Sequence, residues 1–187
     1  MEIAESFRPA SRTDWRRWLT ENHASKREIW LLLEKQRAGL PLSYLDAVEE
    51  ALCFGWIDGI AKSLNATDRA QRFTPRAPGS NWTELNKERA RRLSKLGLMT
   101  DAGRAVLPDL TKVFTLSPAV ERALRADSEA WSNFAKLPPL YQRVRVGYIQ
   151  EQKPESPEFE KRLANFVMRT ARGEMFGNWT DGGRLPA

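Results

Sequence analysis

The chain contains a single cysteine, Cys53, and a single histidine, His23, among its 187 residues. One cysteine cannot form an internal disulfide, so nothing points to an oxidising compartment. One cysteine and one histidine also cannot supply the ligands of a typical zinc site. The composition therefore excludes a disulfide-stabilised scaffold and a zinc protein of the usual cysteine and histidine type.

Long apolar runs and phosphate-binding motifs are missing as well. No stretch reaches the roughly 18 to 20 apolar residues that a membrane-spanning helix needs. The first residues include Glu2 and Glu5 and have no apolar core, unlike a secretory signal peptide. The sequence has neither Gly-x-Gly-x-x-Gly nor a Walker A motif. We therefore expect a cytoplasmic protein without a membrane span and without a nucleotide or other cofactor.

Charged residues are abundant but unevenly placed. The chain has 30 Lys and Arg against 24 Asp and Glu, a net charge of +6. Residues 41–60 carry four acidic residues and no basic one, whereas residues 68–98 carry eight basic and three acidic residues. Such asymmetry can steer an anionic partner, but we favour the simpler interpretation that the two segments pack against each other.

The spacing of apolar residues predicts an α+β protein. Its clearest helix is "SYLDAVEEALCFG", which begins at a Ser43 cap and ends at Gly55. Further helices are expected over 11–23 and 83–97, and strands are expected over 28–35, 56–64 and 70–76. The last two strands form a hairpin around residues 65–69, and a simple register places Asp58 opposite Arg76 and Lys62 opposite Arg72.

These elements suggest a small, mostly antiparallel sheet with helices packed on one side, followed by an all-helical C-terminal region. We expect an α+β domain over 1–110, which contains the hairpin and the basic helix. A helical region should follow over 111–176, with helices that begin at Ser117, at Asp127 or Ser128, and at Ser156. The inward stripe of the last helix is predicted to be Phe159, Leu163, Phe166, Val167 and Thr170. The Gly-rich residues 177–187 are expected to form a mobile tail.

Several stretches resemble a known family. They are "IWLLLEKQRAGLPLSYLDAVEEALCFGWIDG", "RFTPRAPGSNWTELNKERARRL" and "FAKLPPLYQRVRVGYIQEQKPESPEFEKRLANFVMRTARGE". Over nearly its whole length the chain resembles the YdeI/OmpD-associated, bacteriocin-protection family. The resemblance implies a bacterial or archaeal protein with an α+β fold and a C-terminal pair of helices. It also implies a role in tolerance of bacteriocins or antimicrobial peptides, with no agreed enzymatic activity or cofactor.

The hairpin supplies the candidate binding site. Trp56 and Asp58 alternate along one strand, as do Arg72 and Arg76 along the other, and Trp82 follows soon after. If these side chains converge, they form a surface suited to a carboxylate, a phosphate or a peptide end. The alternative is a salt bridge within the sheet that only stabilises the hairpin. We expect a non-enzymatic binding or stress-tolerance protein whose partner is an anionic small molecule or a peptide; the oligomeric state is open.

Two other functional classes remain as alternatives. Lys87, Arg91 and Lys95 recur along one face of the basic helix and could lie against nucleic-acid phosphates, although Glu84 and Glu88 can neutralise this face. A small-molecule enzyme would need a carboxylate as acid or base, with Asp58 or Glu50 as the candidate.

The acidic helix also raises the question of a metal ion or a reactive thiol. Glu49, Glu50 and Asp58 could hold Mg²⁺, but we interpret them as a solvated acidic face and assign no metal. Cys53 lies at a helix C-terminus beside carboxylates, where a thiol pKa rises. We therefore expect a neutral cysteine, packed or partly exposed, and not a nucleophile.

Overall fold

The computed structural model describes residues 3–35, 39 and 41–186. The chain divides into two compact units, one formed by Met1–Asn81 with Arg89–Pro108 and the other by Trp82–Glu88 with Asp109–Ala187. The division falls within one helix, α3 (Glu84–Lys95).

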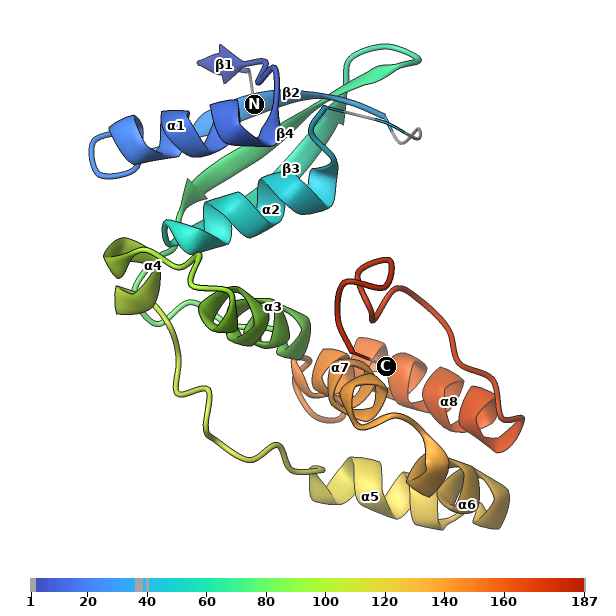
Figure 1. Cartoon of the computed structure of the whole chain (residues 1–187). Helices are drawn as coiled ribbons and strands as arrows, with labels where there is room; N and C mark the ends of the chain where they lie inside the picture. Colours follow the sequence, from blue (N-terminus) through green and yellow to red (C-terminus); the bar gives the residue numbers. More distant parts are fainter. Residues whose placement is uncertain (1–2, 36–38, 40, 187) are drawn as a thin grey trace. The chain divides into compact units, whose positions relative to one another are not determined.

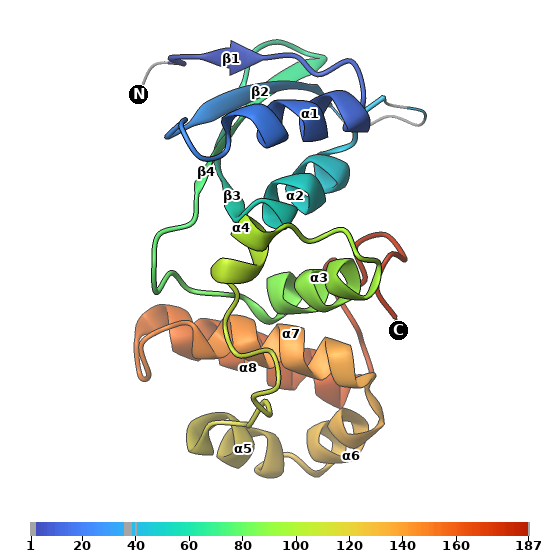
Figure 2. The same cartoon turned by 60° about the vertical axis from the view of Figure 1, so that its left-hand side comes forward.

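The first unit contains a four-stranded sheet in the order β1-β2-β4-β3. Its elements in chain order are β1 (Ser6–Phe7), α1 (Arg12–Asn22), β2 (Ile29–Glu34), α2 (Tyr44–Cys53), β3 (Trp56–Ser63), β4 (Asp68–Pro75), the second part of α3, and α4 (Asp101–Ala105). Helices α1 and α2 lie side by side against the sheet (Figures 1 and 2). The α+β class predicted from the sequence is confirmed.

The sheet is mixed, so the prediction of a mostly antiparallel sheet was wrong. Strand β4 pairs antiparallel with β2 and β3, but β1 pairs parallel with β2. A parallel neighbour requires a crossover, and helix α1 between β1 and β2 provides it. Sequence periodicity could not reveal β1 because it contains only two residues.

The hairpin exists, but its predicted register was wrong. Asp58 lies opposite Phe73 and Lys62 lies opposite Ala70, with a bulge between Asp58 and Ala61. Strand β4 begins two residues earlier than predicted because the side-chain oxygen of Asn65 accepts the backbone N–H groups of Thr67 and Asp68, both at 2.8 Å. This side-chain turn shortens the loop and moves every pair along the ladder.

Tryptophans build much of the first unit's core. Trp15 stacks on Trp18 with ring centroids 5.2 Å apart, and Trp18 meets the edge of Trp56 at 5.8 Å. Trp15 also contacts Phe73 of β4 at 5.6 Å. The buried indoles of Trp15 and Trp56 donate to the backbone oxygens of Ala47 and His23, so their polar atoms are satisfied without a ligand.

Helix α4 docks directly on the C-terminal end of α2. The carbonyl oxygen of Cys53 accepts hydrogen bonds from the backbone N–H of Thr100 at 3.0 Å and from its hydroxyl at 2.7 Å. Gly103 packs against the same carbonyl, where any Cβ would lie 2.1 Å from the oxygen. Gly55, which the sequence placed at the end of α2, has the left-handed φ of 76° that a helix C-terminus favours.

The second unit is helical. It contains the first part of α3 and then α5 (Pro118–Arg125), α6 (Ser128–Lys136), α7 (Pro139–Gln150) and α8 (Pro157–Ala171). Helices α5, α6 and α8 are capped at their N-termini by Ser117, Asp127 and Ser156. Each of these side chains accepts a hydrogen bond from the backbone N–H three residues further along the chain. A buried apolar cluster that includes Leu124, Phe134 and Phe166 joins these helices. Near the C-terminus, Leu185 is buried against α7.

Candidate functional site

Within the first unit, the residues of the predicted hairpin site do not all lie on one face of the sheet. Trp56 is buried in the tryptophan core, and Trp82 belongs to the other unit. Arg72 bonds the carboxylate of Glu28 through Nε at 3.0 Å and Nη2 at 2.5 Å. Because Asp58 lies opposite Phe73, neighbouring Arg72 projects from the other face of the sheet. Arg72 therefore does not join Asp58.

Asp58 and Arg76 do come within electrostatic reach of each other. Burial lowers the pKa of Arg76 to about 10, and the negative charge of Asp58 opposes that shift. The Asp58 carboxylate accepts a hydrogen bond from the hydroxyl of Tyr44 at 2.5 Å. Burial, followed by the charge of Asp58, raises the pKa of Tyr44. The guanidinium of Arg69 lies 4.5 Å above the Tyr44 ring. The predicted role of Asp58 and Arg76 in binding an anion stays a prediction.

The acidic face of α2 is buried and ion-paired, which differs from the solvated face expected from the sequence. Glu49 and Glu50 are 1% and 3% exposed. Arg12 of α1 reaches Glu50 at 2.6 Å and Glu49 at 3.1 Å, and Arg16 reaches Glu50 at 2.6 Å. Arg92 of α3 also reaches Glu49, at 2.9 Å. These carboxylates are therefore engaged as structural ion pairs between helices, partly with the basic 68–98 segment.

Cys53 follows these glutamates and is fully buried. Burial, with the nearby charge of Glu50, raises the pKa of its thiol to about 11. A thiol with this pKa holds very little thiolate near neutral pH. Among the residues described, no group of three or more His, Cys, Asp and Glu side chains could hold a metal ion. Likewise, no described helix is long and apolar enough to cross a membrane.

The candidate nucleic-acid residues are distributed over both units. Lys87 belongs to the second unit and pairs with Glu84 at 2.6 Å, as the interleaved charges suggested. Arg91 and Lys95 belong to the first unit, and Lys95 is exposed. Binding of nucleic acid by these residues stays a prediction.

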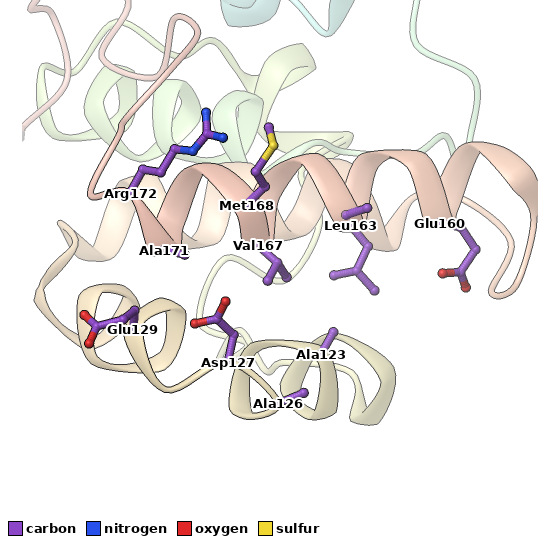
Figure 3. A pocket seen from close by; sticks show the side chains of 11 residues that line it. Ala123, Ala126, Asp127, Glu129, Glu160, Leu163, Val167, Met168, Ala171 and Arg172 are labelled. Carbon is purple, nitrogen blue, oxygen red and sulfur yellow. The ribbon is translucent and has the colours of Figure 1, made fainter.

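The second unit contains an open groove that sequence reasoning did not identify. It has a volume of about 790 Å³ and runs between α8 and the junction of α5 with α6. Figure 3 shows Leu163 and Val167 of α8 pointing toward the segment that carries Ala123 and Asp127. The full lining is Ala123, Ala126, Asp127, Glu129, Glu160, Leu163, Ala164, Val167, Met168, Ala171 and Arg172.

The lining of α8 forms one continuous helical stripe. Its residues occur at steps of three and four from 160 to 171, which is the spacing of one face of an α-helix, and Arg172 follows directly after the helix. The stripe is mostly small or apolar, and Met168 is 44% exposed. Four alanines lie on the two sides of the groove, and their short side chains leave it open. An apolar helix face of this kind normally packs against another element.

Comparison with known families divides the chain into two parts. Residues 7–106 match the model of a domain of unknown function, DUF8412, which covers more than half of the chain. The chain belongs to the DUF8412 family. Residues 113–173 match the family described as bacteriocin-protection, YdeI or OmpD-associated, and this confirms the resemblance for that part of the chain. The resemblance predicted over nearly the whole length is not matched over residues 7–106, which belong to the other model. No curated protein and no solved structure matches the chain.

The groove lies within the YdeI or OmpD-associated part of this DUF8412 member. The sequence does hold a signal for it. The predicted inward stripe of the last helix comprised Phe159, Leu163, Phe166, Val167 and Thr170. A second apolar stripe, formed by Ala164 and Met168, lies outside that core and is exposed. A helix whose apolar arc exceeds its core contacts is the feature that predicts a docking surface.

Proposed function

We propose that this protein is a non-enzymatic binding protein whose second unit takes an amphipathic helix of another polypeptide into the groove beside α8. The observation that carries the proposal is the stripe of α8 that lines the groove, in which small and apolar side chains recur at helical spacing over residues 160–171 and of which Ala164 and Met168 are exposed. Twelve residues of helix rise by about 18 Å, so the groove matches roughly three turns of a partner helix.

The chemistry of the walls supports a helical partner. Alanines at 123, 126, 164 and 171 allow a helix backbone to approach closely, and Leu163 and Val167 supply the apolar floor. Binding of an amphipathic helix in an apolar groove is a common mode of peptide recognition. The volume of about 790 Å³ is within the usual range of ligand sites.

The family description supports a polypeptide partner. Residues 113–173, which contain the groove, match a family described by bacteriocin protection, and bacteriocins are polypeptides. A protein that protects against a polypeptide without any catalytic set can do so by binding it. We therefore place this chain among binding proteins that act in tolerance, with the groove as the contact surface.

Blocking the groove with a bulky side chain tests the proposal. Ala164 is exposed and lines the groove, so Ala164→Trp should fill it without disturbing the core. Ala135→Trp is the matched control, because Ala135 is also exposed, on α6, and is not part of the lining. Fluorescence anisotropy should show that a labelled synthetic amphipathic helix binds the wild type and Ala135→Trp alike.

With Ala164→Trp we expect at least about a tenfold weaker affinity, because the helix backbone can no longer approach α8. Equal affinity for Ala164→Trp and the wild type would contradict the proposal. So would a failure of the wild-type chain to bind amphipathic helices of any charge.

A further inference from the structure

Carboxylates line the rim of the groove. Asp127 and Glu129 stand at the start of α6, and Glu160 stands in the first turn of α8 (Figure 3). The one cation of the lining is Arg172, next to the end of α8. The groove thus has an acidic rim, although the chain as a whole carries a net charge of +6.

Within the part of the chain that the structure describes, none of these three carboxylates forms an ion pair. Asp127 accepts the backbone N–H of Ala130 at 2.9 Å as the cap of α6, and Glu129 and Glu160 have no side-chain partner there.

Other carboxylates of the same unit are paired with arginines. The pairs are Glu121 with Arg125 at 2.9 Å, Glu158 with Arg162 at 2.7 Å, Glu88 with Arg143 at 3.0 Å and Glu174 with Arg169 at 3.3 Å. Arginines of the unit therefore pair with these other carboxylates. The carboxylates of the groove's rim remain available to cations of a binding partner.

Resting on the function proposed above, we infer that the helix accepted by this groove is cationic, with an apolar face toward Leu163 and Val167 and Lys or Arg side chains toward Glu129 and Glu160. A cation beside each carboxylate completes a pair that the chain itself does not provide. An acidic helix would instead bring its carboxylates close to those of the rim. This repulsion between like charges would select against an acidic partner.

Acidic residues at the start of a helix also complement its dipole, and Glu129 and Glu160 occupy such positions. A role limited to the dipole would affect stability and would not affect the choice of ligand. The two roles are therefore separated by measuring affinity against the charge of the probe.

Three synthetic helices of about 18 residues, long enough for four to five turns, serve as probes. They share one Leu and Ala face and carry Lys, Gln or Glu on the other face. Each is titrated by anisotropy into the full chain at low salt. The rim variant is the double substitution Glu129→Gln and Glu160→Gln, and Asp127 is kept because it caps α6.

The control is Glu21→Gln with Glu155→Gln, two exposed residues outside the groove whose replacement changes the net charge equally. We expect the Lys helix to bind the wild type most tightly, and the rim variant to bind it about two- to 25-fold more weakly, since each exposed pair contributes about 1.4- to fivefold. The Gln helix should bind the wild type and the rim variant alike, and added salt should weaken only the Lys helix.

Two results overturn the inference while the proposed function stands. One is a Gln helix that binds the wild type as tightly as the Lys helix does. The other is a rim substitution without a specific effect on the Lys helix. In that case the rim variant binds the Lys helix as tightly as the wild type does, or the control variant loses as much affinity for it as the rim variant does. If none of the three helices binds, both the inference and the proposed function fail.

Discussion

Replacing Gly103 by alanine should destabilise the first unit, although helix propensity alone predicts the opposite. Gly103 lies inside α4, where alanine is favoured over glycine by about 1 kcal/mol. In the structure, however, the new Cβ would lie 2.1 Å from the carbonyl oxygen of Cys53 and 2.7 Å from its carbonyl carbon. Backbone atoms at the end of α2 cannot rotate away as a flexible side chain can, so α4 must move.

The size of the effect follows from what α4 loses when it moves. The two hydrogen bonds from Thr100 to the same oxygen, at 2.7 and 3.0 Å, would lengthen, at about 1 kcal/mol each. Overpacking of a filled site costs a further 1–3 kcal/mol or so. After the gain in propensity of about 1 kcal/mol, a net loss of about 2–4 kcal/mol in the free energy of unfolding remains.

Thiol labelling of Cys53 provides the assay, because this cysteine is the only one in the chain and is fully buried in the first unit. Its buried thiol has a pKa of about 11, so it reacts only when the surrounding structure opens. Labelling of Gly103→Ala should be about 30- to 700-fold faster than that of the wild type, since 1.4 kcal/mol corresponds to a factor of ten.

The control for this experiment is Gly59→Ala in β3. There the new Cβ would meet only the carbonyl oxygen of Arg72, at 3.9 Å, so its labelling rate should stay within about fivefold of the wild type. Labelling of Gly103→Ala at or below the wild-type rate would refute the packing argument.

Two further predictions concern the polar contacts of the first unit. Arg12→Met should lower the free energy of unfolding by about 2–4 kcal/mol because it leaves buried Glu49 and Glu50 with fewer cations. Arg8→Met, which breaks an exposed and solvent-screened pair with Asp68, should lower it much less. Chemical denaturation compares the two, and equal losses would contradict the prediction. Tyr44→Phe should cost about 1.5–3 kcal/mol through the lost bond to Asp58. The pKa of Tyr44 is raised in the folded chain, so its contribution to stability is complete below the unfolded pKa of about 10 and declines at higher pH. The difference in the free energy of unfolding between the wild type and Tyr44→Phe should therefore become smaller above about pH 10.

Local signals in the sequence predicted the helices well. Ser43 caps α2 and forms the reciprocal capping box with Asp46, because a cap depends only on residues three apart. Ser117, Asp127 and Ser156 begin their helices for the same reason. These predictions needed no knowledge of distant parts of the chain.

Features that depend on distant contacts were harder to predict. The hairpin register depends on the way in which Asn65 folds its loop, and a bulge then shifts the remaining pairs. The burial of Glu49 and Glu50 depends on Arg12 and Arg16, more than 30 residues away. The groove exists because the neighbouring helices cover one apolar stripe of α8 and leave the other open. Helical periodicity identifies both stripes as apolar but cannot predict which of them is covered.

The bulge in β3 has a consequence for how this protein behaves at high concentration. Strand β3 is an edge of the sheet and exposes Ile60, which is 51% accessible. A regular edge with such a side chain would offer a template for intermolecular pairing and aggregation. The irregularity between Asp58 and Ala61 interrupts that template, and the opposite edge, β1, is only two residues long. Both borders of the sheet therefore discourage the addition of a foreign strand.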